Sequence, residues 1–195
     1  ILLGGFEETG KPYGKKGIPE SWKFTELQED WDQFEPFMEC GFERFPDLET
    51  AQIRHLSVCA ESFTPDNAFI VGEVPGVKNF FTGCGMNSVG IACSAGVGRA
   101  LSQWIDQGYP EEQLWPVDVR RFFPWQQNAK YLYDRTIEAV GILYHHHYPN
   151  RQRTSARPVS CSPIHDRRAD PGAVFSQAAG WERADWVAPQ DVEPV

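Results

Sequence analysis

The sequence predicts a mixed fold of the α+β or α/β class, and three observations support this prediction. Two short apolar runs, residues 68–71 and 77–82, have the length and composition of β-strands. Residues 28–45 and 131–144 place apolar side chains three or four positions apart, as amphipathic helices do. Of the 195 residues, 41% are hydrophobic and 13% are aromatic, so the chain can form a hydrophobic core.

The first predicted elements are a strand and a helix. Residues 1–6 are apolar and predict the strand, and a loop rich in Gly, Lys and Pro follows. In residues 28–45 the apolar positions share one helical face, and acidic residues fill the first turns, where they favour a helix N-terminus. Pro36 lies inside this pattern, so we expect a kink or a restarted helix there, and Pro46 is expected to end it.

The next segments predict short strands joined by turns. Residues 53–58 alternate apolar and polar side chains imperfectly, which predicts a weak strand. Residues 64–67, Thr-Pro-Asp-Asn, are typical of a turn, because proline presets its own dihedral angle and Asp and Asn favour turns. The strands at 68–71 and 77–82 follow, with residues 72–76 as their connection.

A segment rich in glycine comes next, with glycine at positions 83, 85, 90, 96 and 98. Its pattern indicates a strand end, a turn and then a helix that continues to about Gln107, where Gly108 provides the stop. Exposed backbone amides at the N-terminus of such a helix carry partial positive charge and form a site for anions. The segment could therefore serve a ligand.

These glycines have a second explanation that needs no ligand. Gly83, Gly85 and Gly90 would then serve only the geometry of the turn, while the small residues at 95, 96 and 98 would let the helix pack tightly on a sheet. The segment matches neither G-x-G-x-x-G with an acidic residue downstream nor G-x-x-x-x-G-K-[ST]. The residues alone leave both explanations open.

The remaining part of the chain predicts a packed linker, a helix and a basic loop. Residues 114–125 are aromatic and interrupted by proline, which is typical of a linker that packs on another element. Residues 131–144 combine an apolar stripe with charges, as a half-buried helix does. Residues 149–163 are basic and loop-like, and residues 180–186 are expected to close the ordered part.

Charge and cysteine content exclude several classes of function. The formal net charge is −9, which disfavours attraction to nucleic acid or anionic lipid. No apolar run approaches the roughly 18 residues of a membrane-spanning helix. The five cysteines are widely spaced and form no C-x-x-C pair, which suits a reducing compartment better than a disulfide scaffold. We expect neither a nucleic-acid partner nor a membrane span.

The clusters of reactive side chains predict no metal site and no catalytic residue. His145, His146 and His147 are consecutive, and neighbours on a helix point about 100° apart, so they cannot converge on one ion. Cys84 and Cys93 have no base beside them and are interpreted as small buried apolar residues.

The arginines have two interpretations. Arg120, Arg121 and the cluster between Arg151 and Arg168 could meet an anionic ligand or a protein partner. In an acidic protein, we favour surface arginines that pair with acidic neighbours.

Both ends of the chain are unusual. Residues 1–5 are apolar, with neither an initiator Met nor a basic region of the kind that begins a signal peptide. Residues 188–195 form a polar tail without an obvious element. We therefore expect the chain to be an internal piece of a longer protein.

Three long stretches together resemble one known family. They are "ESFTPDNAFIVGEVPGVKNFFTGCGMNSVGIACSAGVGRALSQWI", "GYPEEQLWPVDVRRF" and "GAVFSQAAGWERADW". In this order they resemble the flavin-dependent dimethylglycine and sarcosine dehydrogenases of choline and glycine one-carbon catabolism. The family also contains a non-oxidising relative, the regulatory subunit of pyruvate dehydrogenase phosphatase. The resemblance covers essentially the whole chain.

The resemblance implies a division into domains. Residues 1–108 would be the C-terminal part of an amine-oxidase-like, DAO-type FAD domain, and residues 109–180 the small central domain. Residues 181–195 would begin a folate-binding, aminomethyltransferase-like region, almost all of which is missing.

The resemblance also implies a cofactor site. In the family, the turn that matches Gly85, Met86, Asn87, Ser88, Val89 and Gly90 lies against the flavin ring of FAD. The helix from about Ile91 would direct its N-terminal amides toward the pyrimidine edge of the ring, where negative charge develops during reduction. Side chains in place of these glycines would then collide with a flat ring.

The chain also departs from the family pattern. The G-x-G-x-x-G unit for the adenosine diphosphate half of FAD is absent, as is the histidine that attaches the flavin covalently. Residues 59–62 read Cys-Ala-Glu-Ser where relatives often have Gly-Pro-Glu-Ser, and Asp170 and Pro171 interrupt a position where relatives continue a helix. We expect this chain by itself to be inactive and to bind FAD weakly or not at all.

Two functions remain open from the resemblance. The first is oxidative demethylation of an N-methyl amino acid, with electron-transfer flavoprotein or oxygen as acceptor and tetrahydrofolate taking the one-carbon unit. The second is regulation through binding of a phosphatase catalytic subunit. "LLGGFE", "LQEDWDQFEP" and residues 107–110 favour the regulatory relative, whereas "GIPESWKF" and "LWPVDVRRF" favour the enzymes. We favour the enzyme, located in the mitochondrial matrix of a eukaryote or otherwise in the cytoplasm.

Overall fold

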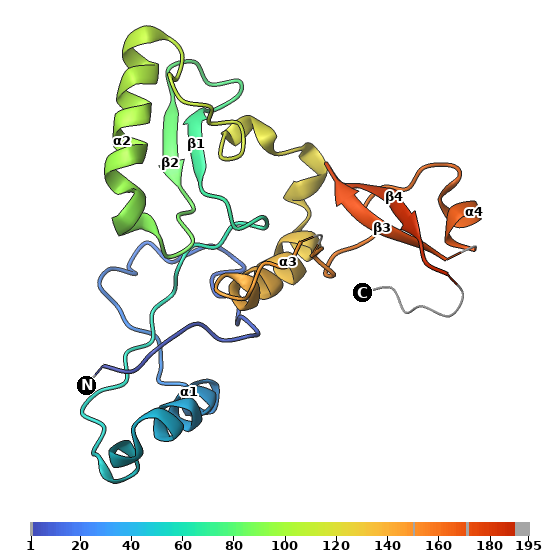
Figure 1. Cartoon of the computed structure of the whole chain (residues 1–195). Coiled ribbons are helices and arrows are strands. Elements are labelled where there is room, and N and C mark those ends of the chain that lie inside the picture. Colours follow the sequence, from blue (N-terminus) through green and yellow to red (C-terminus); the bar gives the residue numbers. More distant parts are fainter. Residues whose placement is uncertain (1, 150, 171, 190–195) are drawn as a thin grey trace. The chain divides into compact units, whose positions relative to one another are not determined.

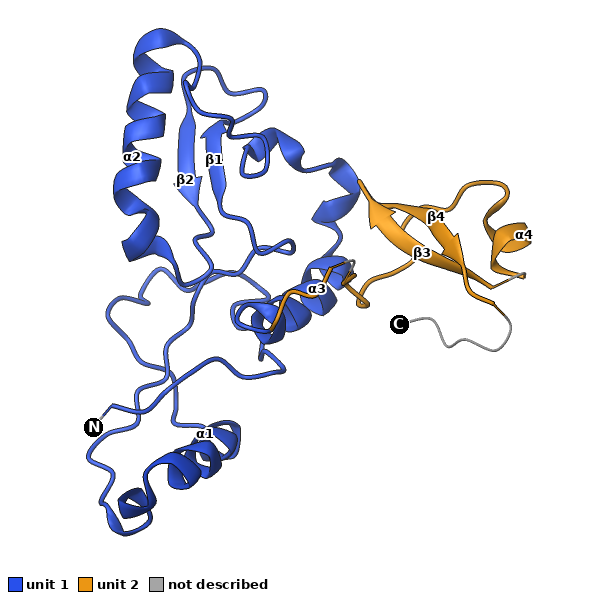
Figure 2. Ribbon diagram, in the orientation of Figure 1, with its two compact units in different colours: residues 1–145 blue, residues 146–195 orange. Residues whose placement is uncertain are grey.

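The computed structural model describes residues 2–149, 151–170 and 172–189, and the chain divides into two compact units. Unit 1 comprises Ile1–His145 and unit 2 comprises His146–Val195 (Figure 1, Figure 2). Both units contain helices and strands, so the predicted mixed class is confirmed. Within the described ranges, no helix is both long enough and apolar enough to cross a membrane.

The helix predicted over residues 28–45 is confirmed as α1, Trp31–Arg44. Asp30 caps it, because its side chain accepts a hydrogen bond from a backbone N–H in the first turn. The helix continues through Pro36, and the short 3-10 helix η1, Pro46–Thr50, follows it. Pro46 therefore ends α1 as expected.

Two predicted strands do not form. Residues 2–6 and 53–58 have no regular secondary structure, so both predictions were wrong. A strand requires a ladder of backbone hydrogen bonds to a partner, and an apolar or alternating pattern does not supply one. The N-terminal segment packs through its side chains instead: the ring of Phe6 lies 5.9 Å from that of Phe63 and 5.4 Å from that of Tyr144.

The two central strands form one antiparallel hairpin. β1, Ile70–Glu73, pairs with β2, Phe81–Cys84, and Val71 lies opposite Gly83. The strands predicted at 68–71 and 77–82 are thus confirmed, although both begin later than expected. Ala68 is still held in the preceding turn by hydrogen bonds from side chains, which delays the first strand.

The aromatic segment 114–125 packs on this hairpin, as its composition predicted. The N–H of Val71 donates to the carbonyl of Val117 at 2.8 Å, and Val71 forms a parallel bridge with Asp118. Two short 3-10 helices follow, η2 (Val119–Arg121) and η3 (Pro124–Gln127). The segment therefore lies beside β1 and extends the edge of the sheet.

The predicted long helix is confirmed as α2, Gly90–Gln107. Gly108 ends it with a left-handed φ of 82°, and its N–H donates to the carbonyl of Trp104. The helix lies close to the hairpin: a Cβ added at Gly83 would be 3.1 Å from Val97, and one at Gly72 would be 2.8 Å from Trp104.

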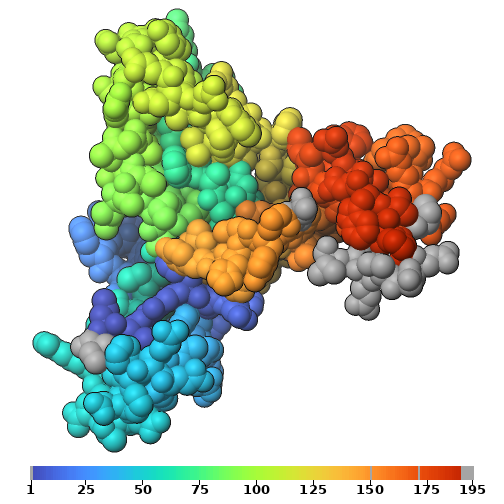
Figure 3. All heavy atoms as spheres, in the orientation of Figure 1, coloured from blue at the N-terminus to red at the C-terminus, as the bar shows by residue number. Residues whose placement is uncertain are grey.

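The outer face of α2 corrects one expectation. The explanation without a ligand had residues 95, 96 and 98 packing tightly on a sheet, but Gly96 and Gly98 are exposed, and a Cβ at either would meet no atom within 4 Å. Figure 3 shows α2 on the surface of unit 1. The helical period explains the error. Val97, between the two glycines, lies beside Gly83 of β2, and its neighbours on either side of it in the sequence point about 100° away.

The helix predicted over residues 131–144 is confirmed as α3, Ala129–Ile142. Asn128 caps it by accepting hydrogen bonds from two backbone N–H groups of the first turn. The N-terminal segment crosses α3 in backbone contact, because a Cβ at Gly141 would lie 1.9 Å from the carbonyl oxygen of Glu8. Gly141 is therefore required for this crossing.

Unit 2 contains a hairpin that the sequence analysis missed. The short helix α4, His165–Ala169, precedes β3, Ala173–Ala178, which pairs antiparallel with β4, Trp181–Val187. Only β4 overlaps the segment that was expected to close the ordered part. Pro171, part of the expected helix break, and most of the predicted polar tail lie outside the described residues.

Candidate functional site

The residues predicted to contact a flavin form the loop from β2 to α2 and the first residues of α2. Gly85, Asn87 and Ser88 have left-handed φ angles of 62°, 46° and 65°. Glycine adopts this conformation without cost, and asparagine adopts it more readily than most residues. The sequence Gly-Met-Asn-Ser therefore folds into a compact turn that leads directly into α2.

Asn87 anchors the loop from inside the protein. Its side chain is 1% exposed, so its polar atoms need partners within the fold. Its Oδ1 accepts a hydrogen bond from the N–H of Thr64 at 2.8 Å, and its Nδ2 donates to the carbonyl of Gly85 at 2.7 Å. Its own N–H donates to the carbonyl of Ser62 at 3.1 Å. The side chain of Asn87 thus holds the loop and is turned away from solvent.

The opposite side of the loop is open. Ser88 is exposed, and its hydroxyl donates to Glu61 Oε1 at 3.1 Å. Ile91, in the first turn of α2, has 98% of its surface exposed. The other predicted contact residues, Gly85, Met86, Val89 and Gly90, are half-buried. A ligand could approach the loop from the side of Ser88 and Ile91.

The N-terminus of α2 has no side-chain cap. Val89 occupies the capping position and has no oxygen to offer, and the first turn contains no acidic residue. The first backbone N–H groups of a helix have no partner inside the helix, and here no capping side chain replaces one. With the helix dipole, these amides form a positive end that suits an anion or a developing negative charge.

The glycines of the loop are required for different reasons. A Cβ at Gly85 would lie 2.7 Å from Thr64 Cγ2, and the residue has a positive φ, so the fold alone demands glycine there. A Cβ at Gly90 would meet only Met86 within 4 Å, at 3.3 Å from its Cβ and 3.5 Å from its Cγ, so Met86 would have to shift by a few tenths of an ångström. The fold thus restricts a side chain at Gly90 less than at Gly85.

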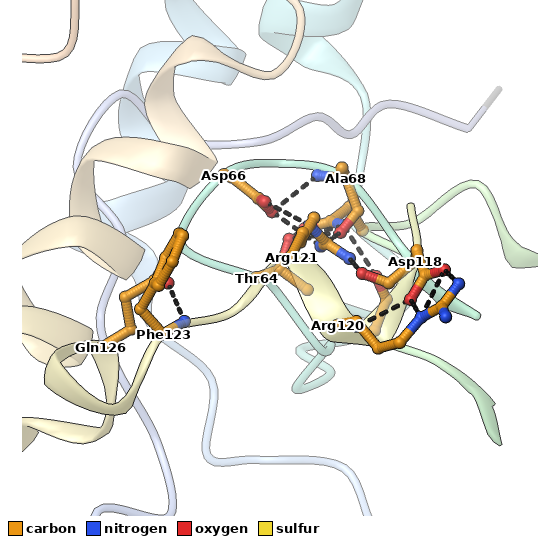
Figure 4. A network of polar contacts seen from close by, with 10 residues as sticks. Thr64, Asp66, Ala68, Asp118, Arg120, Arg121, Phe123 and Gln126 are labelled. Atoms are coloured by element: carbon orange, nitrogen blue, oxygen red, sulfur yellow. Dashed lines mark hydrogen bonds and ion pairs between the residues drawn. The ribbon is translucent and has the colours of Figure 1, made fainter. Parts of the chain in front are cut away.

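A network of polar contacts joins Arg121 to the turn at residues 64–68 (Figure 4). Arg121 donates from Nε and Nη2 to the two carboxylate oxygens of Asp66, at 2.6 and 3.0 Å, and from Nη2 to the carbonyl of Ala68 at 2.8 Å. The hydroxyl of Thr64 donates to the same Ala68 carbonyl at 2.8 Å. Sequence analysis assigned residues 64–66 a structural role but missed both Arg121 and Asn87 as their partners.

The arginines lower the pKa values of their acidic partners. Burial alone would raise the pKa of Asp66, but hydrogen bonds from Arg121 and its positive charge outweigh burial and lower it. Hydrogen bonds from Arg120 lower the pKa of Asp118, and the same pairing raises the pKa of Arg120. The pairing with acidic neighbours expected for Arg120 and Arg121 is therefore confirmed.

The remaining candidates lie outside this site. His145, His146 and His147 are exposed and follow the end of α3, and the described residues contain no cluster of three potential metal ligands. Cys84 is exposed and Cys93 is half-buried, so the prediction that both are buried was wrong. Cys84 is the last residue of β2, and all five cysteines are free thiols.

Comparison with protein families identifies two matching segments. Residues 1–104 match the family described as FAD dependent oxidoreductase, and residues 107–162 match the FAD dependent oxidoreductase central domain. The first match contains the whole loop from β2 to α2. The second begins at Gln107, the last residue of α2, and includes Arg121.

Curated relatives align along nearly the whole chain. The mitochondrial regulatory subunit of pyruvate dehydrogenase phosphatase from Mus musculus is 37% identical over 97% of this chain. The formaldehyde-forming 4-methylaminobutanoate oxidase of Paenarthrobacter nicotinovorans is 38% identical over 100%, and the mitochondrial sarcosine dehydrogenase of Mus musculus is 32% identical over 100%. The chain spans only 21 to 23% of the length of these relatives. The family resemblance in the sequence is confirmed.

Proposed function

The chain belongs to the FAD dependent oxidoreductase family, and from this premise we propose that it is part of a longer flavoenzyme that oxidises N-methylated amino acids. The match over residues 1–104 carries the proposal. The names of two relatives support the substrate class, since one is an oxidase of 4-methylaminobutanoate and another a dehydrogenase of sarcosine. Both substrates carry a methylamino group.

The loop supports FAD as the cofactor. Its open side carries the uncapped amides of α2, with no acidic side chain in the first turn to compete for them. We propose that residues Gly85–Ile91 contact the flavin, with the amides of α2 stabilising negative charge on it. Bound FAD would take a hydride from the N-methyl carbon of the substrate and leave an imine.

The role of this chain is to position and tune the cofactor. Asn87 holds the turn in a fixed shape, so the amides need not reorganise when charge develops nearby. We propose residues 1–108 as the end of the FAD domain, 109–180 as the central domain and 181–195 as the start of a folate-binding region. Tetrahydrofolate would accept the one-carbon unit there, and the electron acceptor would be electron-transfer flavoprotein or oxygen.

A second candidate is regulation of a phosphatase. The 37% identity to the pyruvate dehydrogenase phosphatase regulatory subunit, over 97% of this chain, favours it. In that case the protein would act by binding a phosphatase catalytic subunit. Several relatives are named as mitochondrial, which supports a mitochondrial location for a eukaryotic protein under either candidate.

The full-length protein distinguishes the two candidates. It would be purified, its FAD content measured from the visible spectrum, and its oxidation of sarcosine, dimethylglycine and 4-methylaminobutanoate followed with an artificial electron acceptor. If the protein is the enzyme, it should contain bound FAD whose visible absorbance falls when one of these amines is added. The regulatory candidate would be favoured instead by two results together. The protein would bind FAD but oxidise none of the amines, and mixing it with a pyruvate dehydrogenase phosphatase catalytic subunit would change the activity of that subunit.

A further inference from the structure

We infer that Arg121 is a positioning residue for the flavin loop, residues 85–89 between β2 and α2. Through Arg121, the segment that matches the central domain controls the environment of the cofactor. Arg121 belongs to the second family match, residues 107–162, whereas the loop lies in the first. The inference rests on the proposed function for its cofactor, but its structural part concerns only residues of this chain.

The contacts run without a gap from Arg121 to the turn before β1. The guanidinium binds both carboxylate oxygens of Asp66 and the carbonyl of Ala68, which lie 55 and 53 residues away along the chain. Its side chain is only 14% exposed, so water screens these interactions weakly. A planar fork of N–H donors makes this pattern, and a lysine ammonium cannot reproduce it.

The same turn holds the loop. The Ala68 carbonyl that accepts from Arg121 also accepts from the hydroxyl of Thr64. Thr64 in turn binds Asn87, through its N–H at 2.8 Å and through its hydroxyl, which accepts from Asn87 Nδ2 at 3.1 Å. Thr64 and Asn87 are 4% and 1% exposed, so this link is buried. A shift of the turn therefore moves the anchor of the loop.

The neighbouring Arg120 provides a matched control. It carries the same charge and also binds an aspartate, but its partner Asp118 is two residues away, and its side chain is 63% exposed. Arg121 donates to the backbone carbonyl of Asp118 at 3.2 Å, but within the described part of the chain neither Arg120 nor the Asp118 carboxylate bonds to the turn at residues 64–68. Loss of Arg120 removes a charge from the same segment without loosening the turn.

Hydrogen exchange tests the structural part in the full-length protein. The N–H groups of Asn87 and Val89 are bonded to the carbonyls of Ser62 and Met86, and their exchange reports opening of the loop. Arg121→Gln should accelerate their exchange by roughly tenfold to a hundredfold, the equivalent of losing hydrogen bonds to a charged group. The helix-terminal N–H of Gly108 should exchange at the wild-type rate.

The remaining variants settle the interpretation. Arg120→Gln should leave exchange at Asn87 and Val89 unchanged, and Arg121→Lys should give an intermediate acceleration. If Arg121→Gln does not fold, Arg121→Lys decides the question. Unchanged exchange at residues 85–89 in a folded Arg121 variant would overturn the inference.

The visible spectrum and the reduction potential of the bound flavin distinguish a specific role of Arg121 from a general loss of stability. Arg121→Gln should shift the visible spectrum or the reduction potential of the bound flavin, with a smaller shift in Arg121→Lys. Gly141→Ala would place a Cβ 1.9 Å from the backbone carbonyl oxygen of Glu8, so it serves as a control that lowers stability without replacing a residue of the network. An equal flavin shift in Gly141→Ala would refute a specific role for Arg121. If the wild-type protein binds no FAD, the proposed function fails, but the exchange data still decide whether Arg121 positions the loop.

Discussion

Replacing Gly72 by alanine should be among the most destabilising single-methyl changes in the chain. Gly72 lies in β1 with a φ of +126°, a conformation that residues with a side chain rarely adopt. The added Cβ would also lie 2.8 Å from two atoms of the Trp104 indole, which is buried between α2 and the hairpin. The backbone conformation costs about 1–3 kcal/mol, and overpacking a well-packed core costs about 1–3 kcal/mol. We expect a loss of about 2–6 kcal/mol, a large part of the stability of a typical domain.

Urea unfolding of the chain, followed by tryptophan fluorescence, measures this loss, and a second substitution separates its two causes. Trp104→Phe removes ring atoms that the new methyl would strike. The loss in free energy of unfolding of the double variant should therefore be smaller than the sum of the two single losses, by about 1 kcal/mol or more. Gly98→Ala is the control. Nothing lies within 4 Å of its Cβ, and the helix should gain about 1 kcal/mol from the replacement of glycine. A loss below about 1 kcal/mol in Gly72→Ala, or simple additivity with Trp104→Phe, would refute the packing argument.

Three further outcomes are expected. In the full-length protein, Gly90→Val should lower the FAD content or the reduction potential while leaving folding nearly intact; wild-type values for both would remove Gly90 from the flavin site. The pKa of Asp66 is lowered in the folded state, so its pairing with Arg121 stabilises the chain at pH values above the ordinary aspartate pKa of about 4. This stabilisation is lost as the pH falls through the lower pKa of the folded state. Urea midpoints should therefore fall more steeply on acidification in the wild type than in Asp66→Asn, and equal slopes would contradict the pairing. Gly141→Ala should displace the N-terminal segment from α3, which limited proteolysis near Glu8 would detect as faster cleavage.

Local signals in the sequence predicted the helices well. Asp30 precedes an apolar pattern at helical spacing, and Gly108 follows one, and both occupy the capping positions that their chemistry favours. The predicted strands at 1–6 and 53–58 failed because a strand depends on a partner that local pattern cannot identify. The β3–β4 hairpin was missed for the same reason, although β3 carries the apolar start of the "GAVFSQAAGW" motif.

The turn before α2 was predicted from the sequence, but the contacts that hold it were not, and the flavin contacts stay a prediction. The glycines and Asn87 identify a tight turn before a helix, and the structure has that turn. Its anchors come from positions 23 and 55 residues apart in the chain, as with Thr64 and Asn87 or Asp66 and Arg121. Contacts at such separations leave no periodic trace in a single sequence. Only the typical turn sequence at residues 64–67 hinted that this region is held rigidly.

The structure also separates what the fold requires from what a ligand would require. Gly85 and Asn87 are explained by contacts inside the chain, so they would be needed in an oxidising enzyme and in a regulatory relative alike. Gly90 and the uncapped amides of α2 are different, because a Cβ at Gly90 would need only a small shift of Met86 and the fold supplies no cap at Val89. A flavin on the open side gives both features a reason in either candidate, because the regulatory candidate also allows bound FAD. The Gly90→Val variant therefore tests the flavin contact itself, whereas a substitution at Gly85 or Asn87 would disturb the fold whether or not a flavin binds.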